Sequence, residues 1–270
     1  MSNAGETVSF ERSVLSVNAL EASHVMGLLD RSLDAVVAPN WFSPEACMAI
    51  AERVKKSQYY SAYPDYPTVG RLGQELFECS SEADFARYQA NALTLIRDMR
   101  GLAHPYITPV DRLRLELDDI WPTGCNLKKL GDKKAFAGVV REYRETSSAE
   151  PHCDVIAWDI LESHKGQTSV TNQIAANVYL KTSESGGELL LWDEWPSQST
   201  YNVAHNAEGI GLDKKKIPAR KLEIAPKQGD LILFNSMRIH SVKEIKDSVR
   251  MTWACFIGYS GPDAPLVIWS

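Results

Sequence analysis

The second half of the chain is a series of short runs of β-branched and apolar residues, separated by Gly, Pro, Asp and Asn. From about residue 125 onward, no helical periodicity interrupts this series. Short strands without intervening helices predict a mostly antiparallel sandwich or barrel, such as a jelly roll. The expected strands cover residues 138–144, 152–157, 173–181, 187–192, 220–224, 230–235, 238–245 and 249–260.

The first 125 residues have a different texture. Periodicity is weak up to about residue 30, a short strand is expected at Val36-Val37, and 59–73 is expected to be an ordered loop. Ser43 followed by Pro44 is typical of a helix start and predicts a helix to about residue 57. Two further helices are expected after the capping residues Ser81 and Thr108.

Together these patterns predict one α+β domain over 1–270 with a mostly β core. The core, 126–270, is expected to be a double-stranded β-helix, that is, a cupin-like jelly roll. The helices of 1–125 are expected to pack on one outer face of it. The polar segment 193–219 is expected to be an insertion loop that acts as a lid, since long loops are often functional.

Composition excludes several classes of protein. The net charge of -6 argues against a nucleic-acid partner. The Lys214-Lys215-Lys216 run is expected to be a solvated loop. No apolar run approaches the ~20 residues that span a bilayer. The five cysteines are widely spaced and include no CxxC pair, which argues against disulfides or structural zinc and predicts a cytoplasmic location.

The segment Pro151-His152-Cys153-Asp154 carries the main chemical signal. Alternation along a strand predicts that His152 and Asp154 face the same side. A second histidine, His240, follows in a later strand. Two imidazoles and one carboxylate form the facial triad of non-heme iron(II) oxygenases, which leaves coordination positions open. An HxD tripeptide alone is common by chance, so its surroundings matter.

Arg250 lies ten residues after His240, and Thr252 follows it. On a neighbouring strand, Arg250 would point into the same interior as His240. A buried guanidinium requires a carboxylate partner, which the far carboxylate of 2-oxoglutarate supplies. Thr252, on the same strand face, would add a hydroxyl bond. The alternative for Arg250 is a surface ion pair with Asp247.

Two turn-and-strand units lie between the ligand segments, and with them the chain resembles the iron(II)/2-oxoglutarate-dependent dioxygenase superfamily, in its prolyl-4-hydroxylase-like branch. The resemblance covers about 135–260 and implies iron(II), 2-oxoglutarate and O2 as cofactors and co-substrates. The matching elements are Tyr143, Pro151-His152-x-Asp154, Gly186-Gly187-Glu188-Leu189, Gly229-Asp230-Leu231 before Phe234, His240, and Arg250-x-Thr252.

Within that superfamily, the arrangement also resembles the freestanding carbon halogenases of welwitindolinone-type alkaloid biosynthesis, a branch of secondary metabolism. It is similar in layout to hydroxylases of N-substituted amino acids as well. The halogenases carry Gly or Ala where this chain has Asp154, and that vacancy admits chloride. The resemblance therefore implies hydroxylation here, with desaturation, cyclisation or halogenation as alternative outcomes.

Several further residues are candidates for the site. Tyr143 and Thr252 are expected to support 2-oxoglutarate, and Asn177 is expected to reach the cofactor or to be an ordinary strand residue. Arg141 either binds a carboxylate of substrate or cofactor, or lies at the surface. The other residues considered are tryptophans that wall a pocket or pack the core (Trp158, Trp192, Trp195) and histidines without a functional role (His104, and the solvated His164 and His205).

Three functions compete. The first is a hydroxylase of a small molecule, an amino-acid derivative or alkaloid-like metabolite, which yields succinate and CO2 from 2-oxoglutarate. The second uses the same cofactors on a peptidyl substrate, and it predicts an open groove in place of a lid. The third is a non-catalytic jelly-roll binding module, which predicts a missing ligand. A homodimer is expected.

Overall fold

Two sheets of the computed structural model form the core, which the structure describes over 13–64, 66–206, 211–218 and 222–270. The large ten-stranded sheet has the order β1-β2-β13-β10-β15-β8-β4-β3, with β16 and β5 attached beside β15. Its strands are β1 (Ser13–Ser16), β2 (Leu33–Ala38), β3 (Ser61–Ala62), β4 (Val69–Leu72), β5 (Cys125–Leu127), β8 (Val139–Arg144), β10 (Asn172–Lys181), β13 (Leu231–Asn235), β15 (Val249–Tyr259) and β16 (Leu266–Trp269).

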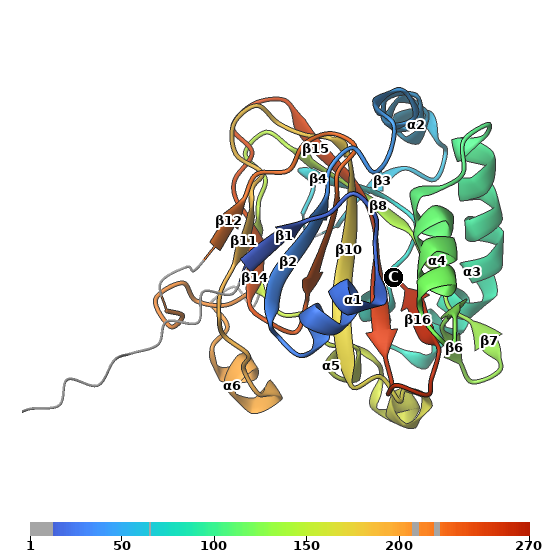
Figure 1. Cartoon of the computed structure of the whole chain (residues 1–270), viewed down its shortest axis with the longest axis vertical. Coiled ribbons are helices and arrows are strands. Elements are labelled where there is room, and N and C mark those ends of the chain that lie inside the picture. Colours follow the sequence, from blue (N-terminus) through green and yellow to red (C-terminus); the bar gives the residue numbers. More distant parts are fainter. Residues whose placement is uncertain (1–12, 65, 207–210, 219–221) are drawn as a thin grey trace, which may run out of the picture.

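The small sheet lies against one face of the large sheet (Figure 1). It has the order β12-β11-β14-β9. A separate hairpin, β6 (Lys129–Leu130) with β7 (Lys133–Lys134), lies outside both sheets. The strands of the small sheet are β9 (Ala149–His152), β11 (Leu189–Leu191), β12 (Leu222–Ile224) and β14 (His240–Val242).

α3 and α4 cover the opposite face of the large sheet, on the far side from β11 and β14, whereas α6 lies on the side of the small sheet (Figure 1). The α-helices are α1 (Ala22–Leu29), α2 (Pro44–Lys56), α3 (Glu82–Ala103), α4 (Pro109–Ile120), α5 (Ile156–Asp159) and α6 (Gln198–Val203), and the 3₁₀ helices are η1 (Leu76–Glu78) and η2 (Glu162–Gln167). Ser43, Ser81 and Thr108 cap α2, α3 and α4 through their side chains, as the sequence predicted.

Alternation along β10 explains how one strand serves both layers. Ile174, Ala176 and Val178 pack into the core that the helices share, whereas Ala175 and Tyr179 pack toward the small sheet. Each fully buried apolar side chain of this kind contributes about 1.5–3 kcal/mol. The large sheet is therefore anchored by the helices on one face and leaves its other face to form the interior between the sheets.

The N-terminal part contributes strands as well as helices. β1 and β2 extend the edge of the large sheet, and β3 and β4 extend it at the other end. The segment before residue 30, expected to have weak periodicity, and the segment 59–73, expected to be an ordered loop, thus contain strands. Pairing with other strands satisfies their backbone groups. Residues 1–12 lie outside the described residues. The division into 1–125 and 126–270 of one domain stays a prediction.

The predicted strand at 152–157 is wrong. β9 ends at His152, and the chain then turns into the short helix α5. The cause is tertiary: the backbone amide of Asp154 donates to the Ser236 carbonyl at 2.9 Å and leaves the sheet ladder. The strand predicted at 238–245 is shorter, and β5, β6, β7 and β16 were not predicted. Residues 220 and 221 of the predicted strand 220–224 lie outside the described residues.

In the described part of the chain, no helix combines the length and apolar character needed to cross a membrane.

Candidate active site

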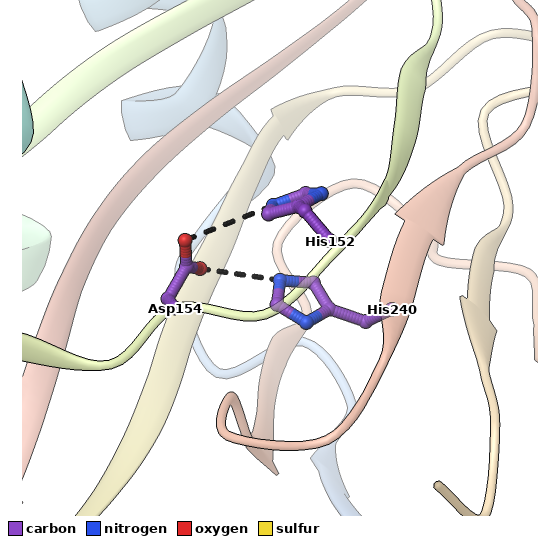
Figure 2. Close-up of side chains that lie close together, drawn as sticks. All are labelled: His152, Asp154 and His240. Atoms are coloured by element: carbon purple, nitrogen blue, oxygen red, sulfur yellow. Dashed lines mark ion pairs between the residues drawn. The ribbon is translucent and has the colours of Figure 1, made fainter. Parts of the chain in front are cut away.

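His152, Asp154 and His240 converge at the open end of the small sheet (Figure 2). His152 ends β9 and is the register partner of His240 at the start of β14. The Asp154 carboxylate lies 3.2 Å from Nε2 of His240 and 3.8 Å from Nε2 of His152. One ligand atom from each residue lies within 4.8 Å of the other two, which fits three ligands around one metal ion.

The backbone orients both imidazoles. Nδ1 of His152 donates to the Glu150 carbonyl at 2.7 Å, and Nδ1 of His240 donates to the Arg238 carbonyl at 3.0 Å. Because a carbonyl only accepts, each ring carries its proton on Nδ1, and Nε2 with its free lone pair faces Asp154. Such second hydrogen bonds fix the tautomer that a metal ligand needs.

The electrostatics of the triad favour the protonation states that bind a cation. Burial and the neighbouring His240 lower the pKa of His152 to about 4. Burial raises the pKa of Asp154, but His152 and His240 outweigh it and lower that pKa to about 2. At neutral pH the site therefore offers neutral imidazole and ionised carboxylate, which are the metal-binding forms. Asp154 reaches this position from the loop after β9, not through the strand alternation that the sequence suggested.

Arg250 projects from β15 into the same interior. Its side chain is buried, its guanidinium lies between the rings of Tyr143 and Tyr179, and it donates to the Tyr179 hydroxyl at 3.3 Å. Nε of Arg250 has no hydrogen-bond partner among the residues that the structure describes. Asp247 instead accepts backbone hydrogen bonds from Glu184 and Ser185, so the surface ion pair considered as an alternative is not formed. A buried guanidinium with a free donor fits a carboxylate ligand.

A cavity of about 600 Å³ joins these groups. Its volume lies within the range of small-molecule sites. The predicted site residues all line it: Arg141, Tyr143, His152, Asp154, Asn177, His240, Arg250 and Thr252.

Arg141 is not a surface residue. Its guanidinium pairs with the buried Glu75, and its Nε donates to the Tyr63 hydroxyl at 3.3 Å, while Tyr63 itself donates to Glu75. Arg141 also lines the cavity. Arg141 is thus held by Glu75 and Tyr63 in a place where it can meet a ligand carboxylate.

Three supporting residues lie on neighbouring strands. Tyr143 on β8 is the register partner of Arg250, and Thr252 on β15 pairs with Arg141. Asn177 on β10 pairs with Ala254 of β15. Burial raises the pKa of Tyr143, so this residue keeps its phenolic proton. Their roles toward a cofactor stay predictions.

Residues from outside the jelly roll close the cavity, and the sequence did not reveal them. The N-terminal part supplies Tyr63, Tyr66 and Phe77, and the segment 193–219 supplies Tyr201 and His205. The side chain of Ser197 caps α6, the helix that contains Tyr201. A capping serine is a sequence signal for a helix start, and it could have placed Tyr201 on a short helix. Residues 207–210 and 219 of the segment lie outside the described residues. Lys214, Lys215 and Lys216 are exposed, as expected.

The three tryptophans follow the second of the two alternatives considered for them, which is packing. Trp158, Trp192 and Trp195 are absent from the described lining of the cavity: Trp158 packs on Tyr201, Trp192 is buried, and Trp195 carries the guanidinium of Arg31. Their large apolar surfaces are used for packing.

Two histidines that were expected to be solvated have other surroundings. His164 is not simply solvated, because its ring stacks on Phe85 at 3.9 Å and bonds to Glu82 at 2.9 Å. His205 lines the cavity. His104 was expected to have no functional role, and it is the C-cap residue of α3.

Comparisons with known proteins agree with this site. The family model described as "Carrier-protein-independent halogenase WelO5" matches residues 12–270. The L-gamma-glutamyl-L-propargylglycine hydroxylase of Streptantibioticus cattleyicolor is 28% identical over 201 residues, which are 72% of this chain and 69% of that protein. The L-isoleucine 3(1)-dioxygenase of Pantoea ananatis is 26% identical over 132 residues, which are 46% of this chain and 42% of that protein.

A solved structure shows the same fold. The N-substituted L-amino acid dioxygenase of Burkholderia ambifaria AMMD, in complex with alpha-KG, superposes with a TM-score of 0.65 at 17% identity, over 92% of this chain and 91% of that chain. The predicted fold class, a jelly roll with helices, is thereby confirmed.

The fold and the site define a non-heme iron oxygenase of the 2-oxoglutarate-dependent class, and the predicted resemblance to that superfamily is confirmed. Within it, this chain belongs to the carrier-protein-independent halogenase WelO5 family. It is an enzyme, as the sequence indicated.

Proposed function

We propose that this enzyme hydroxylates an unactivated C–H bond of a small amino-acid derivative, using iron(II), 2-oxoglutarate and O2. Two relatives support the substrate class, since one is named for a γ-glutamyl amino acid and the other for L-isoleucine. The segment 193–219 contributes Tyr201 and His205 to the cavity wall, which favours a small molecule over a peptidyl substrate.

The chain's residues fit the cofactors. His152, Asp154 and His240 would hold iron(II), because their ligand atoms converge and carry the right protonation states. Arg250 would hold the far carboxylate of 2-oxoglutarate through its unpartnered Nε and its neighbouring nitrogen, with Thr252 on the same strand face. When bound, the metal, 2-oxoglutarate and O2 supply the oxidant that converts C–H to C–OH, with release of succinate and CO2.

The protein's contribution is binding and exclusion of water. Arg141, fixed by Glu75 and Tyr63, would orient a substrate carboxylate beside the metal site. Phe234 and Phe256 line the apolar part of the cavity. Holding the reacting carbon close to the oxidant converts a bimolecular encounter into an intramolecular step. Tyr143 keeps its proton and can donate a hydrogen bond to a cofactor carboxylate.

Asp154 is the observation that selects hydroxylation over halogenation. Its carboxylate occupies the third corner of the triad, 3.2 Å from Nε2 of His240. A chloride ion would need that position. Membership of a family described as halogenases makes chlorination the second candidate, and Asp154 argues against it.

The test is a mass-spectrometric screen of amino acids and γ-glutamyl dipeptides with iron(II), 2-oxoglutarate, O2 and chloride. We expect a product heavier by one oxygen, together with succinate, and loss of both in Asp154→Ala. A product two hydrogens lighter would indicate desaturation or cyclisation, and a chlorinated product would overturn the argument from Asp154. Full activity of Asp154→Ala would overturn the ligand assignment. A homodimer and a cytoplasmic location stay predictions.

A further inference from the structure

Asp159 borders the cavity, and no cationic side chain of the described residues lies beside it. It ends α5, and its electrostatic neighbours are Asp154, Cys153 and Tyr201, none of which is positively charged. Among the described residues, only the backbone of Val155 stabilises its ionised form. Burying an ionised carboxylate without a partner is costly, so a compensating charge is expected from the ligand.

Apart from Asp154, the other acidic side chains of the described cavity wall are already compensated. Glu78 pairs with Arg71, and Glu150 pairs with Lys214 at 3.0 Å. Glu75, which lies behind the wall, pairs with Arg141. These three pairs leave Asp154, Asp159 and Arg250 as the formal charges to be balanced.

The two cofactors together leave the sum of these three charges unchanged. Iron(II) carries two positive charges and 2-oxoglutarate carries two negative ones, so they cancel. Asp154 and Arg250, which would bind them, cancel as well. Asp159 is therefore the acid that stays uncompensated within the described wall of the loaded enzyme.

Resting on the proposed function, we propose that Asp159 pairs with an ammonium group of the substrate, so that the enzyme takes a free amino acid or a small peptide with a free amine in preference to an N-acylated amino acid. The position suits this role, since Tyr201 lies in the same part of the cavity and offers an aromatic ring to a cation.

Arg141 and Asp159 have different electrostatic neighbours. Arg141 is electrostatically coupled to Glu75, Tyr63, Tyr143 and Asp154, whereas it is not among the groups that shift the pKa of Asp159. Asp154 is thus an electrostatic neighbour of both Arg141 and Asp159. A zwitterion would place its carboxylate at Arg141 and an ammonium at Asp159, both in the wall that also carries His152, Asp154 and His240.

The raised pKa of Asp159 agrees with a missing cation. Burial, followed by the negative charge of Asp154, raises this pKa to about 8. Binding of a cation favours the ionised form and lowers the pKa again.

Equilibrium dialysis tests the proposal without turnover. The full-length protein, loaded with Zn(II) and 2-oxoglutarate, is dialysed against a mixture of L-isoleucine, L-leucine and γ-L-glutamyl-L-norvaline, together with the N-acetyl form of each. Retained compounds are quantified by mass spectrometry. We expect retention of at least one amine about tenfold or more above its N-acetyl form, since a hydrogen bond to a charged group has roughly this value.

Variants assign the preference to the residue. Asp159→Asn should reduce the ratio of amine to N-acetyl retention to about one, and Asp159→Glu, which keeps the charge, should retain part of it. Glu78→Gln removes a carboxylate from the same wall whose charge Arg71 already balances, and it should leave the ratio unchanged. Circular dichroism confirms that each variant is folded.

Several results would overturn the proposal: equal or better retention of the N-acetyl forms, retention of no amine, or an unchanged ratio in Asp159→Asn. Failure of the proposed function would appear elsewhere, as absence of 2-oxoglutarate binding in calorimetry or absence of succinate in the aerobic iron(II) reaction. The two failures are therefore distinguishable.

Discussion

Arg250→Met separates a ligand-binding arginine from a structural one. Arg250 is 3% exposed and, within the described chain, has no carboxylate partner. If it binds the far carboxylate of 2-oxoglutarate with two charge-assisted hydrogen bonds, their loss costs about 3 to 4 kcal/mol. At about 1.4 kcal/mol per factor of ten, the Kd for 2-oxoglutarate should rise about 100- to 1,000-fold. Arg250→Lys keeps the positive charge but loses the planar guanidinium that binds a carboxylate with two hydrogen bonds. Its Kd for 2-oxoglutarate should lie between those of the original protein and of Arg250→Met.

The same substitution should not destabilise the protein without ligands. Removing a buried charge that lacks an acidic partner relieves a desolvation cost, so the free energy of unfolding should stay level or increase. Arg238 provides the matched control, because it is also buried but pairs with Asp34 at 2.7 Å. Arg238→Met should lower the free energy of unfolding by about 3–5 kcal/mol, since it removes one member of a buried ion pair.

Calorimetry with Zn(II)-loaded protein measures 2-oxoglutarate affinity, and urea unfolding of metal-free protein measures stability. The reasoning is refuted if Arg250→Met binds 2-oxoglutarate within about threefold of the original protein. It is equally refuted if Arg250→Met loses as much stability as Arg238→Met.

Three further predictions concern the metal site and its acidic neighbour. Asp154→Gly should weaken Zn(II) binding by at least about tenfold in calorimetry and abolish hydroxylation, and unchanged affinity would contradict its role as a ligand. The lowered pKa of His152, about 4, means that the unfolded chain takes up a proton near pH 6.5 that the folded chain does not. Urea unfolding of the metal-free protein should therefore show stability falling as pH decreases from about 6.5 to about 4, less so in His152→Gln. The pKa of Asp159 is raised to about 8, so this acid destabilises the fold increasingly as pH rises from its ordinary value of 3.8 toward 8. Asp159→Asn should gain about 1–3 kcal/mol over the original protein at pH 8 and nothing at pH 4, and a gain independent of pH would refute that origin.

The residue types of the metal site were readable from the sequence, but their geometry was not. His152 and Asp154 were expected to share a strand face, whereas Asp154 lies beyond the end of β9. Its position depends on a backbone hydrogen bond to Ser236, which lies 82 residues away. Strand alternation is a local rule, and it cannot anticipate a contact that only the folded chain makes.

The cavity wall was the least predictable part. Arg141 was recognised as a candidate, yet its partner Glu75 lies 66 residues away, beyond the end of the predicted loop 59–73. Asp159 follows the segment of His152 and Asp154 closely, but it is singled out only by its half-buried position on the cavity wall and by the lack of a cation beside it among the described residues. The Arg141–Glu75 pair and the surroundings of Asp159 both depend on packing between distant segments. They could therefore not be predicted from composition or periodicity.

The metal-site and cofactor residues lie on different parts of the fold from several residues of the cavity wall, which has a consequence for directed evolution. The small sheet and its loops carry His152 and His240, and the large sheet carries Arg250. Tyr66, Phe77 and Tyr201, in contrast, come from segments outside either ladder. A library confined to these three positions would therefore diversify the accepted substrate while leaving the oxidising machinery intact, a form of modularity that suits stepwise engineering.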